Sequence, residues 1–184
     1  NTGPAGIIIL RALLLTMTLI MVIWRLQRWH VSFPVSFIFI FILFLATLKT
    51  VGERPVLITI LFTAVVLFLL EDFKDSRTRR IFLLAPLMLL WSNMHGGFVI
   101  GAGIIIVYML GEGINIFLKR SAHTKKEMFL FYGAAALAIV ASSVNPTGWD
   151  ALFIAITIPF KYQAIHQWVQ EYVSPCDLYT HKLY

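Results

Sequence analysis

His95 is the side chain of this sequence whose type and setting could most directly do chemistry, because an imidazole can act as hydrogen-bond donor, general base or phosphate contact. It stands in the stretch 91–97 (WSNMHGG), a polar break between two apolar runs. The adjacent Gly96 and Gly97 let a backbone approach a ligand closely, and the free N–H groups at the start of the next helix favour an anion such as a phosphate. We expect His95 to be a catalytic candidate and both glycines to bind substrate. Helix packing is the alternative interpretation for Gly97, which forms a G-x-x-x-G pair with Gly101.

Three further acidic or basic positions have a chemical reading. Arg54, in the turn Glu53-Arg54-Pro55, could pair with a phosphate or pyrophosphate, although a salt bridge within the turn is an equal alternative. Glu171 is the other catalytic candidate, or a solvated residue. Glu112 lies inside an apolar run, where a carboxylate suggests a function, although pairing with the nearby Lys119 and Arg120 explains it cheaply.

The composition places the chain in a membrane. Of its 184 residues 59% are hydrophobic and 13% are charged, and the mean hydropathy is +0.84, far more apolar than an ordinary globular domain. The net charge of +6 falls in short clusters between apolar runs, so we expect membrane lipid and no nucleic acid as a partner. The single Cys176 excludes an internal disulfide. No metal-binding or nucleotide-binding motif is recognisable, so we expect no cofactor, and a divalent cation only with residues outside this chain.

The apolar runs predict an all-α, polytopic transmembrane helix bundle that forms one domain over residues 1–184. We expect about six spans, followed by a run too short to cross a bilayer, which predicts an interfacial or re-entrant helix. The spans are 6–24, 33–48, 56–70, 81–91, 98–118 and 128–144, and the interfacial segment is 151–160.

Lysine and arginine gather in alternate loops, at 25–28, 74–80 and 119–126, which the positive-inside rule places in the cytoplasm. Both termini of this chain are then extracytoplasmic. The other loops share that outer side, and they carry the Glu53–Pro55 turn, the 91–97 break and the segment after Val144. We interpret these polar turns, Asn93 among them, as the wall of one pocket at the outer membrane surface. The alternative is that they are ordinary turn formers.

The order of these motifs resembles that of bacterial polytopic proteins of the GT-C glycosyltransferase superfamily. The resemblance covers residues 54–175 and rests on Arg54-Pro55 before a span, a basic loop, the stretch 90–98 (LWSNMHGGF), the stretch 145–149 (NPTGW), and Glu171 with Ser174-Pro175. It implies transfer of a sugar from a polyprenyl-phosphate carrier to an acceptor outside the bacterial cytoplasmic (inner) membrane.

By the same resemblance, Arg54, His95, Asn145 and Trp149 line the donor pocket, and Glu171 lies near the acceptor. Members of this superfamily resemble one another in carrying a catalytic acid in the first large external loop, and this sequence shows no such loop. We therefore interpret the chain as an internal fragment or a shortened homologue. The competing hypothesis is a non-catalytic structural or accessory subunit bound to other membrane subunits. A transporter ranks last, because few polar residues could line a path across the membrane.

Overall fold

The computed structural model describes residues 3–48 and 56–161, and all the regular structure in these two ranges is helical. The prediction of an all-α chain is confirmed for this part. The helices are α1 (Gly3–Arg28), α2 (Phe33–Leu48), α3 (Val56–Ser76), the 3₁₀ helix η1 (Arg79–Leu83), α4 (Leu84–Met94), α5 (Phe98–Phe117), α6 (Lys125–Ser142) and α7 (Asp150–Lys161).

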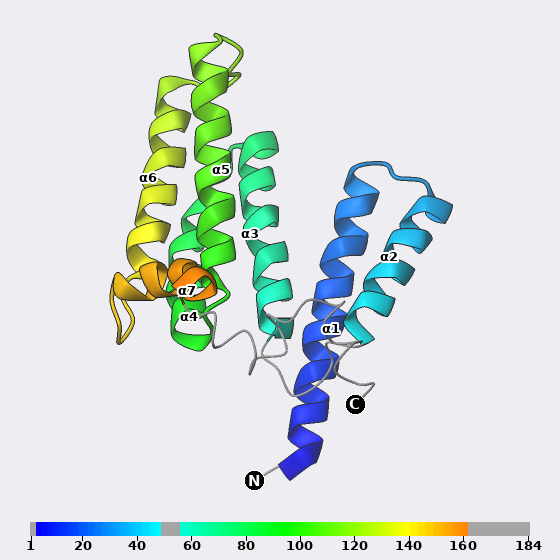
Figure 1. Cartoon of the computed structure of the whole chain (residues 1–184). Coiled ribbons are helices and arrows are strands. Elements are labelled where there is room, and N and C mark those ends of the chain that lie inside the picture. Colours follow the sequence, from blue (N-terminus) through cyan, green and yellow to red (C-terminus); the bar gives the residue numbers. More distant parts are fainter. Residues whose placement is uncertain (1–2, 49–55, 162–184) are drawn as a thin grey trace.

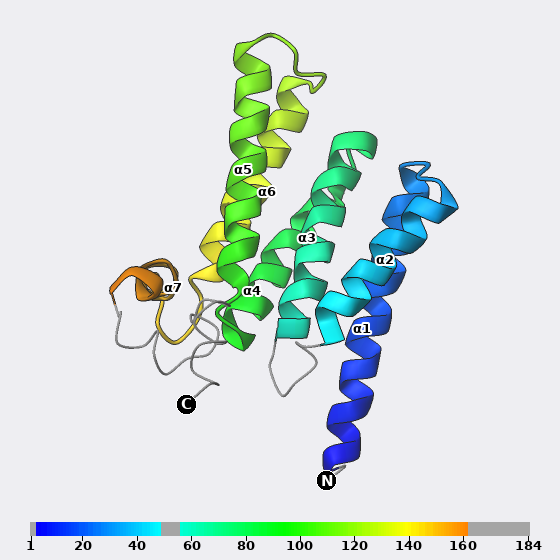
Figure 2. The same ribbon diagram turned by 45° about the vertical axis from the view of Figure 1, so that its right-hand side comes forward.

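Helices α3 to α6 form the main bundle, and the α1–α2 hairpin lies beside α3 (Figure 1). Successive helices run up and down, so the turns alternate between two ends. One end, which we call the basic end, holds the turns 29–32, 77–78 and 118–124. The opposite end, which we call the break end, holds the turns 95–97 and 143–149. Helix α7 runs across the break end instead of along the bundle (Figure 2).

The core lies where α4 packs between α3, α5 and α6. Trp91 and Met88 of α4 are fully buried, as is Ile105 of α5. Helix α6 presents small side chains to α4, with Ala134 and Ala138 fully buried. Small residues let two helix backbones approach closely, which gains van der Waals contact where no hydrophobic effect drives helices together. The α4–α6 contact is therefore the tightest part of the bundle.

In the described part of the chain, three helices are long and apolar enough to cross a membrane: residues 5–28, α3 and α5. The prediction of a transmembrane helical protein is supported to that extent, and the count of six spans is not. Helix α2 has 16 residues and α4 has 11, while α6 carries three charged residues, Lys125, Lys126 and Glu127, in its first turn. The start of α6 is a capping box, in which the Thr124 N–H donates to the Glu127 carboxylate and lowers its pKa.

The predicted break at 91–97 is shorter than the sequence suggested. Helix α4 continues through Met94, because its polar side chains bond back into the helix: Ser92 Oγ and Asn93 Nδ2 both donate to the Leu89 carbonyl, at 3.1 and 2.8 Å. Trp91, expected at the break, is instead fully buried in the core. Only residues 95–97 separate α4 from α5.

Gly101 lets α5 pack directly on Trp91, because a Cβ placed there would lie 2.5 Å from the indole ring. We predict that Gly101→Ala destabilises the protein by about 1–3 kcal/mol through overpacking. Gly103→Ala is the matched control on the same helix, since a Cβ there meets nothing within 4 Å. Thermal unfolding of both variants in detergent checks this, and equal midpoints would contradict the packing.

Candidate functional site

At the break end the structure joins two of the predicted polar turns. Asn93 Nδ2, on the last turn of α4, donates to its own Leu89 carbonyl and across to the Val144 carbonyl after α6, both at 2.8 Å. The α4–α5 break and the α6–α7 turn therefore lie against each other, as the sequence predicted for these two. These two bonds use both amide hydrogens of Asn93. Asn93 therefore links the end of α4 to the residues that follow α6.

His95 follows the last residue of α4, and its hydrogen bonds are made with residues close to it in the sequence. It is the C-cap of α4, with extended backbone (φ −158°, ψ 142°), and its N–H donates to the Trp91 carbonyl at 3.0 Å. Its Nδ1 accepts the Gly97 N–H at 3.1 Å. A neutral imidazole that accepts at Nδ1 carries its proton on Nε2. Within the described residues Nε2 has no partner, and the half-buried ring therefore offers one oriented donor at this end.

The two glycines of the break differ in their surroundings. A Cβ on Gly96 would meet nothing within 4 Å, so this position has open space beside it. A Cβ on Gly97 would lie 2.2 Å from the Thr59 hydroxyl, so glycine is required there for α5 to approach α3. Helix packing therefore explains the glycine at position 97, whereas the open space beside Gly96 can admit a ligand.

The turn 143–149 is built around Asn145. Its Oδ1 accepts from the N–H and the hydroxyl of Thr147, at 2.9 and 2.8 Å, and its Nδ2 donates to the Ser142 carbonyl at 2.8 Å. Gly148 takes the left-handed conformation, φ +59°, that closes the turn. Asn145 is committed to its own turn, and Trp149 is about half exposed.

The predicted site is therefore only partly assembled in the described residues. Asn93 reaches the turn that contains Asn145, and His95 bonds to Gly97. No contact joins His95 to Asn145 or Trp149 in the described part of the chain. Arg54, Glu53 and Glu171 lie outside the described residues, as does Cys176. Within residues 3–48 and 56–161, no group of three or more His, Cys, Asp and Glu side chains could hold a metal ion.

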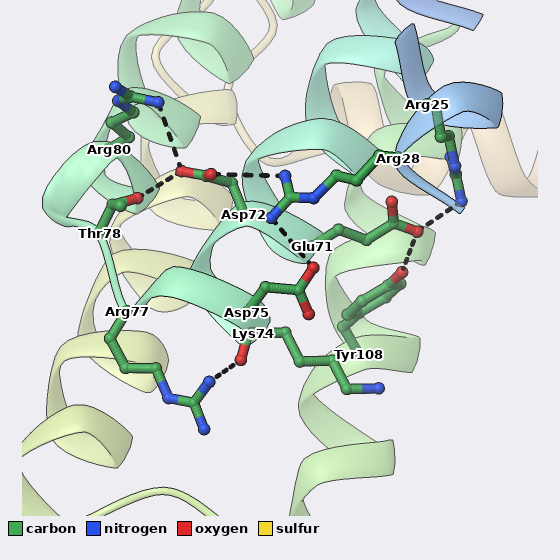
Figure 3. A network of polar contacts seen from close by, with 10 residues as sticks. All are labelled: Arg25, Arg28, Glu71, Asp72, Lys74, Asp75, Arg77, Thr78, Arg80 and Tyr108. Carbon is green, nitrogen blue, oxygen red and sulfur yellow. Dashed lines mark hydrogen bonds and ion pairs between the residues drawn. The ribbon is translucent and has the colours of Figure 1, made fainter. Parts of the chain in front are cut away.

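A second polar cluster, at the basic end, was not predicted as a cluster from the sequence (Figure 3). Asp72 of α3, 5% exposed, is its centre. Its carboxylate accepts the Thr78 hydroxyl at 2.5 Å and lies 3.6 Å from Arg28 of α1 and 3.8 Å from Arg80 of η1. One buried carboxylate thus joins α1, α3 and η1.

Neighbouring pairs extend this cluster. Arg28 also binds Asp75 at 3.0 Å, and Arg25 binds Glu71 at 2.5 Å, where Tyr108 of α5 also donates to Glu71 at 3.5 Å. The guanidinium of Arg25 lies 4.7 Å from the centre of the Trp29 ring, a cation–π contact. The charges at 25–28 and 71–80, predicted from the sequence only as topology signals, hold the α1–α2 hairpin to the bundle.

The helices whose C-termini lie at the basic end share one local backbone conformation. Within two residues after α1, α3 and α5, a basic or titratable residue takes a left-handed backbone: His30 (φ 53°), Arg77 (φ 53°) and Lys119 (φ 56°). This conformation closes a helix C-terminus, and positive side chains there complement the negative end of the helix dipole. The clustering of basic residues at this end thus has a local cause besides membrane topology.

Glu112 does not form the predicted ion pair with Lys119 or Arg120. Its two carboxylate oxygens accept from the Ser121 hydroxyl and, at 3.3 Å, from Asn115 Nδ2. The chain turns back after α5 by bonding the N–H groups of Arg120 and Ser121 to the Asn115 carbonyl, at 2.8 and 3.1 Å, and this brings Ser121 onto Glu112.

No protein-family model, curated protein or solved structure matches this chain.

We predict that Asp72→Asn lowers the free energy of unfolding by about 1–3 kcal/mol, because it removes the charge that two arginines and a hydroxyl share in a buried site. Asp75→Asn is the matched control: its side chain is 53% exposed and pairs with one arginine, so its loss costs less than about 1 kcal/mol. Unfolding by denaturant in detergent measures both changes. Equal losses would contradict a special role for Asp72.

Proposed function

We propose that the chain is part of an integral membrane glycosyltransferase that moves a sugar from a polyprenyl-phosphate carrier to an extracytoplasmic acceptor. The observation that supports it is the bond from Asn93 to the Val144 carbonyl, which brings two glycine-bearing turns together at the end opposite the basic turns. Such an end, at the membrane surface, suits a substrate whose lipid tail stays in the bilayer and whose phosphate and sugar reach out of it.

In this proposal α1 to α6 all cross the bacterial cytoplasmic membrane. η1 and α4 cross together as residues 79–94, and α7 lies in the outer interface, where an apolar helix of 12 residues is stable without spanning. The basic end faces the cytoplasm by the positive-inside rule, and the start of α1 and the whole of α7 face outward.

His95 has the central role at the proposed site. Its Nε2–H, oriented by the Gly97 N–H on the opposite ring nitrogen, donates to an oxygen of the carrier phosphate beside the open space at Gly96. Arg54 supplies a second positive group for the phosphate, and Glu171 an acid near the acceptor. The catalytic base comes from residues outside this chain.

The second candidate is a non-catalytic subunit of a larger membrane complex, and the surface of the hairpin favours it. Apolar side chains cover α2 on several sides, with Phe33 82% exposed and Phe37 and Phe41 stacked on one face at 6.2 Å. In this function Asn93 and Asn145 only fix helix ends, and α2 binds another membrane helix.

Two matched single substitutions, one at each end of the bundle, test the proposal. Asparagine at position 95 can still accept the Gly97 N–H, as Nδ1 does, but it removes Nε2. We predict that His95→Asn lowers sugar transfer from a polyprenyl-phosphate donor by about tenfold or more, the loss of one hydrogen bond to a charged group. His30→Asn, the same change at the basic end in a left-handed position that asparagine tolerates, leaves transfer unchanged.

The two candidates separate in this assay, performed on the full-length protein purified from its natural membrane. Unchanged transfer by His95→Asn contradicts the role of His95. Absence of transfer by the unmodified protein contradicts the glycosyltransferase and favours the subunit, which should then be isolated with a stoichiometric membrane partner.

A further inference from the structure

A cavity of about 250 Å³ opens at the basic end between α3, α5 and the turn before α6. It shares Tyr108 with the cluster around Asp72 and lies away from the break end. Its apolar wall includes Leu70, Val107 and Phe131, and its polar groups are those of Lys74, Tyr108, Glu112, Asn115 and His123. The volume is roughly eight times the ~30 Å³ share of a water molecule in the liquid. A bare ion is too small for it, and a small organic molecule of about eight heavy atoms matches it.

Two opposite charges line this cavity without pairing. The Glu112 carboxylate is fixed by Ser121 and Asn115, and no cation lies within 4.0 Å of it among the described residues. Lys74 extends below Tyr108 towards α5, and its ammonium has no acceptor in this part of the chain (Figure 3). The Glu112 carboxylate, on an apolar wall, favours a cation beside it. Lys74 is exposed at the mouth of the cavity, where its ammonium can bind an anion.

The aromatic wall adds a third recognition group. His123 stacks on Phe73 at 5.6 Å, and Phe73 stacks on Phe131 at 5.7 Å. His123 lines the cavity, while its Nδ1 atom is buried without a hydrogen-bond partner among the described residues. Aromatic rings beside a carboxylate are the surroundings that an organic ammonium group prefers.

We infer that this cavity binds a small zwitterion that carries a phosphate and an ammonium group. The ammonium binds Glu112 against the aromatic wall, and the phosphate binds Lys74 at the mouth. Two sources share this chemistry: the headgroup of an ethanolamine phospholipid, and free phosphoethanolamine. The site lies at the opposite end from His95 and is independent of the proposed sugar transfer.

Free phosphoethanolamine tests the chemistry on the full-length protein in an uncharged detergent, by calorimetry. Ethanolamine and inorganic phosphate, each carrying one half of the charge pattern, are the comparison ligands. We expect phosphoethanolamine to bind at least about tenfold more tightly than either half, because each charge-assisted contact is worth about one factor of ten. Glu112→Gln, which removes the charge and can still accept one of the hydrogen bonds from Ser121 and Asn115, should remove most of this advantage.

Matched controls distinguish binding inside the cavity from a general effect of the charge at the basic end. Glu127→Gln removes the same charge from an exposed position while a glutamine still completes the capping box, and it should leave binding unchanged. Gly111→Leu tests the space without a change of charge: Gly111 lines the cavity, and a Cβ there meets nothing within 4 Å, so a larger side chain should block binding. Equal affinity in Glu112→Gln and the unmodified protein, or phosphate binding as tightly as phosphoethanolamine, overturns the inference.

Native mass spectrometry from nanodiscs identifies the source. If the lipid headgroup is the ligand, the protein retains a phosphatidylethanolamine more often than a phosphatidylglycerol, and Glu112→Gln abolishes the preference. If the free molecule is the ligand, calorimetry shows binding while the two lipids are retained equally. No calorimetric binding together with no lipid preference contradicts the site altogether.

Discussion

The buried carboxylate of Asp72 is the interaction on which the arrangement of this protein depends most. It receives Arg28 from α1, Arg80 from η1 and the hydroxyl of Thr78, and so fixes the hairpin, the long helix α3 and the entry to α4 at one point. A carboxylate in so apolar a chain is costly unless it is paired and hydrogen-bonded. The partners that offset this cost come from α1, from η1 and from the turn before η1, so it is met when these elements lie against α3 at this end.

The opposite end is held by neutral hydrogen bonds and small residues. Asn93 braces α4 against the turn after α6, and Gly97 lets the start of α5 lie on α3. In the described turns, charges therefore concentrate at the basic end and backbone-directed polar groups at the break end. This division agrees with the proposed orientation, in which the positive side chains of the basic end stay in the cytoplasm.

The sequence predicted the helices well because their signal is local. Helices α2, α3 and α5 begin at the residues expected, whereas α1 and α3 continue past their apolar runs, to Arg28 and Ser76. It failed where a side chain acts within its own helix: Ser92 and Asn93 were interpreted as a break, yet their bonds to the Leu89 carbonyl continue α4. It also could not pair Arg28 with Asp72, since no periodicity reports contacts between residues 44 positions apart. Of the candidate site, alternating topology indicated that the end of α4 and the turn after α6 share one end of the bundle, whereas nothing in the sequence indicated that Asn145 bonds within its own turn.

The account depends most on the two ends lying on opposite faces of one membrane, and cysteine accessibility measures this directly. With Cys176 replaced by serine, single cysteines at Ala122, in the basic end, and at Gly96, in the break end, are treated with a membrane-impermeant thiol reagent in intact cells. Both positions are exposed. The account predicts that Gly96→Cys is labelled in intact cells and that Ala122→Cys is labelled only after the membrane is opened. Labelling of both from the same side would contradict it.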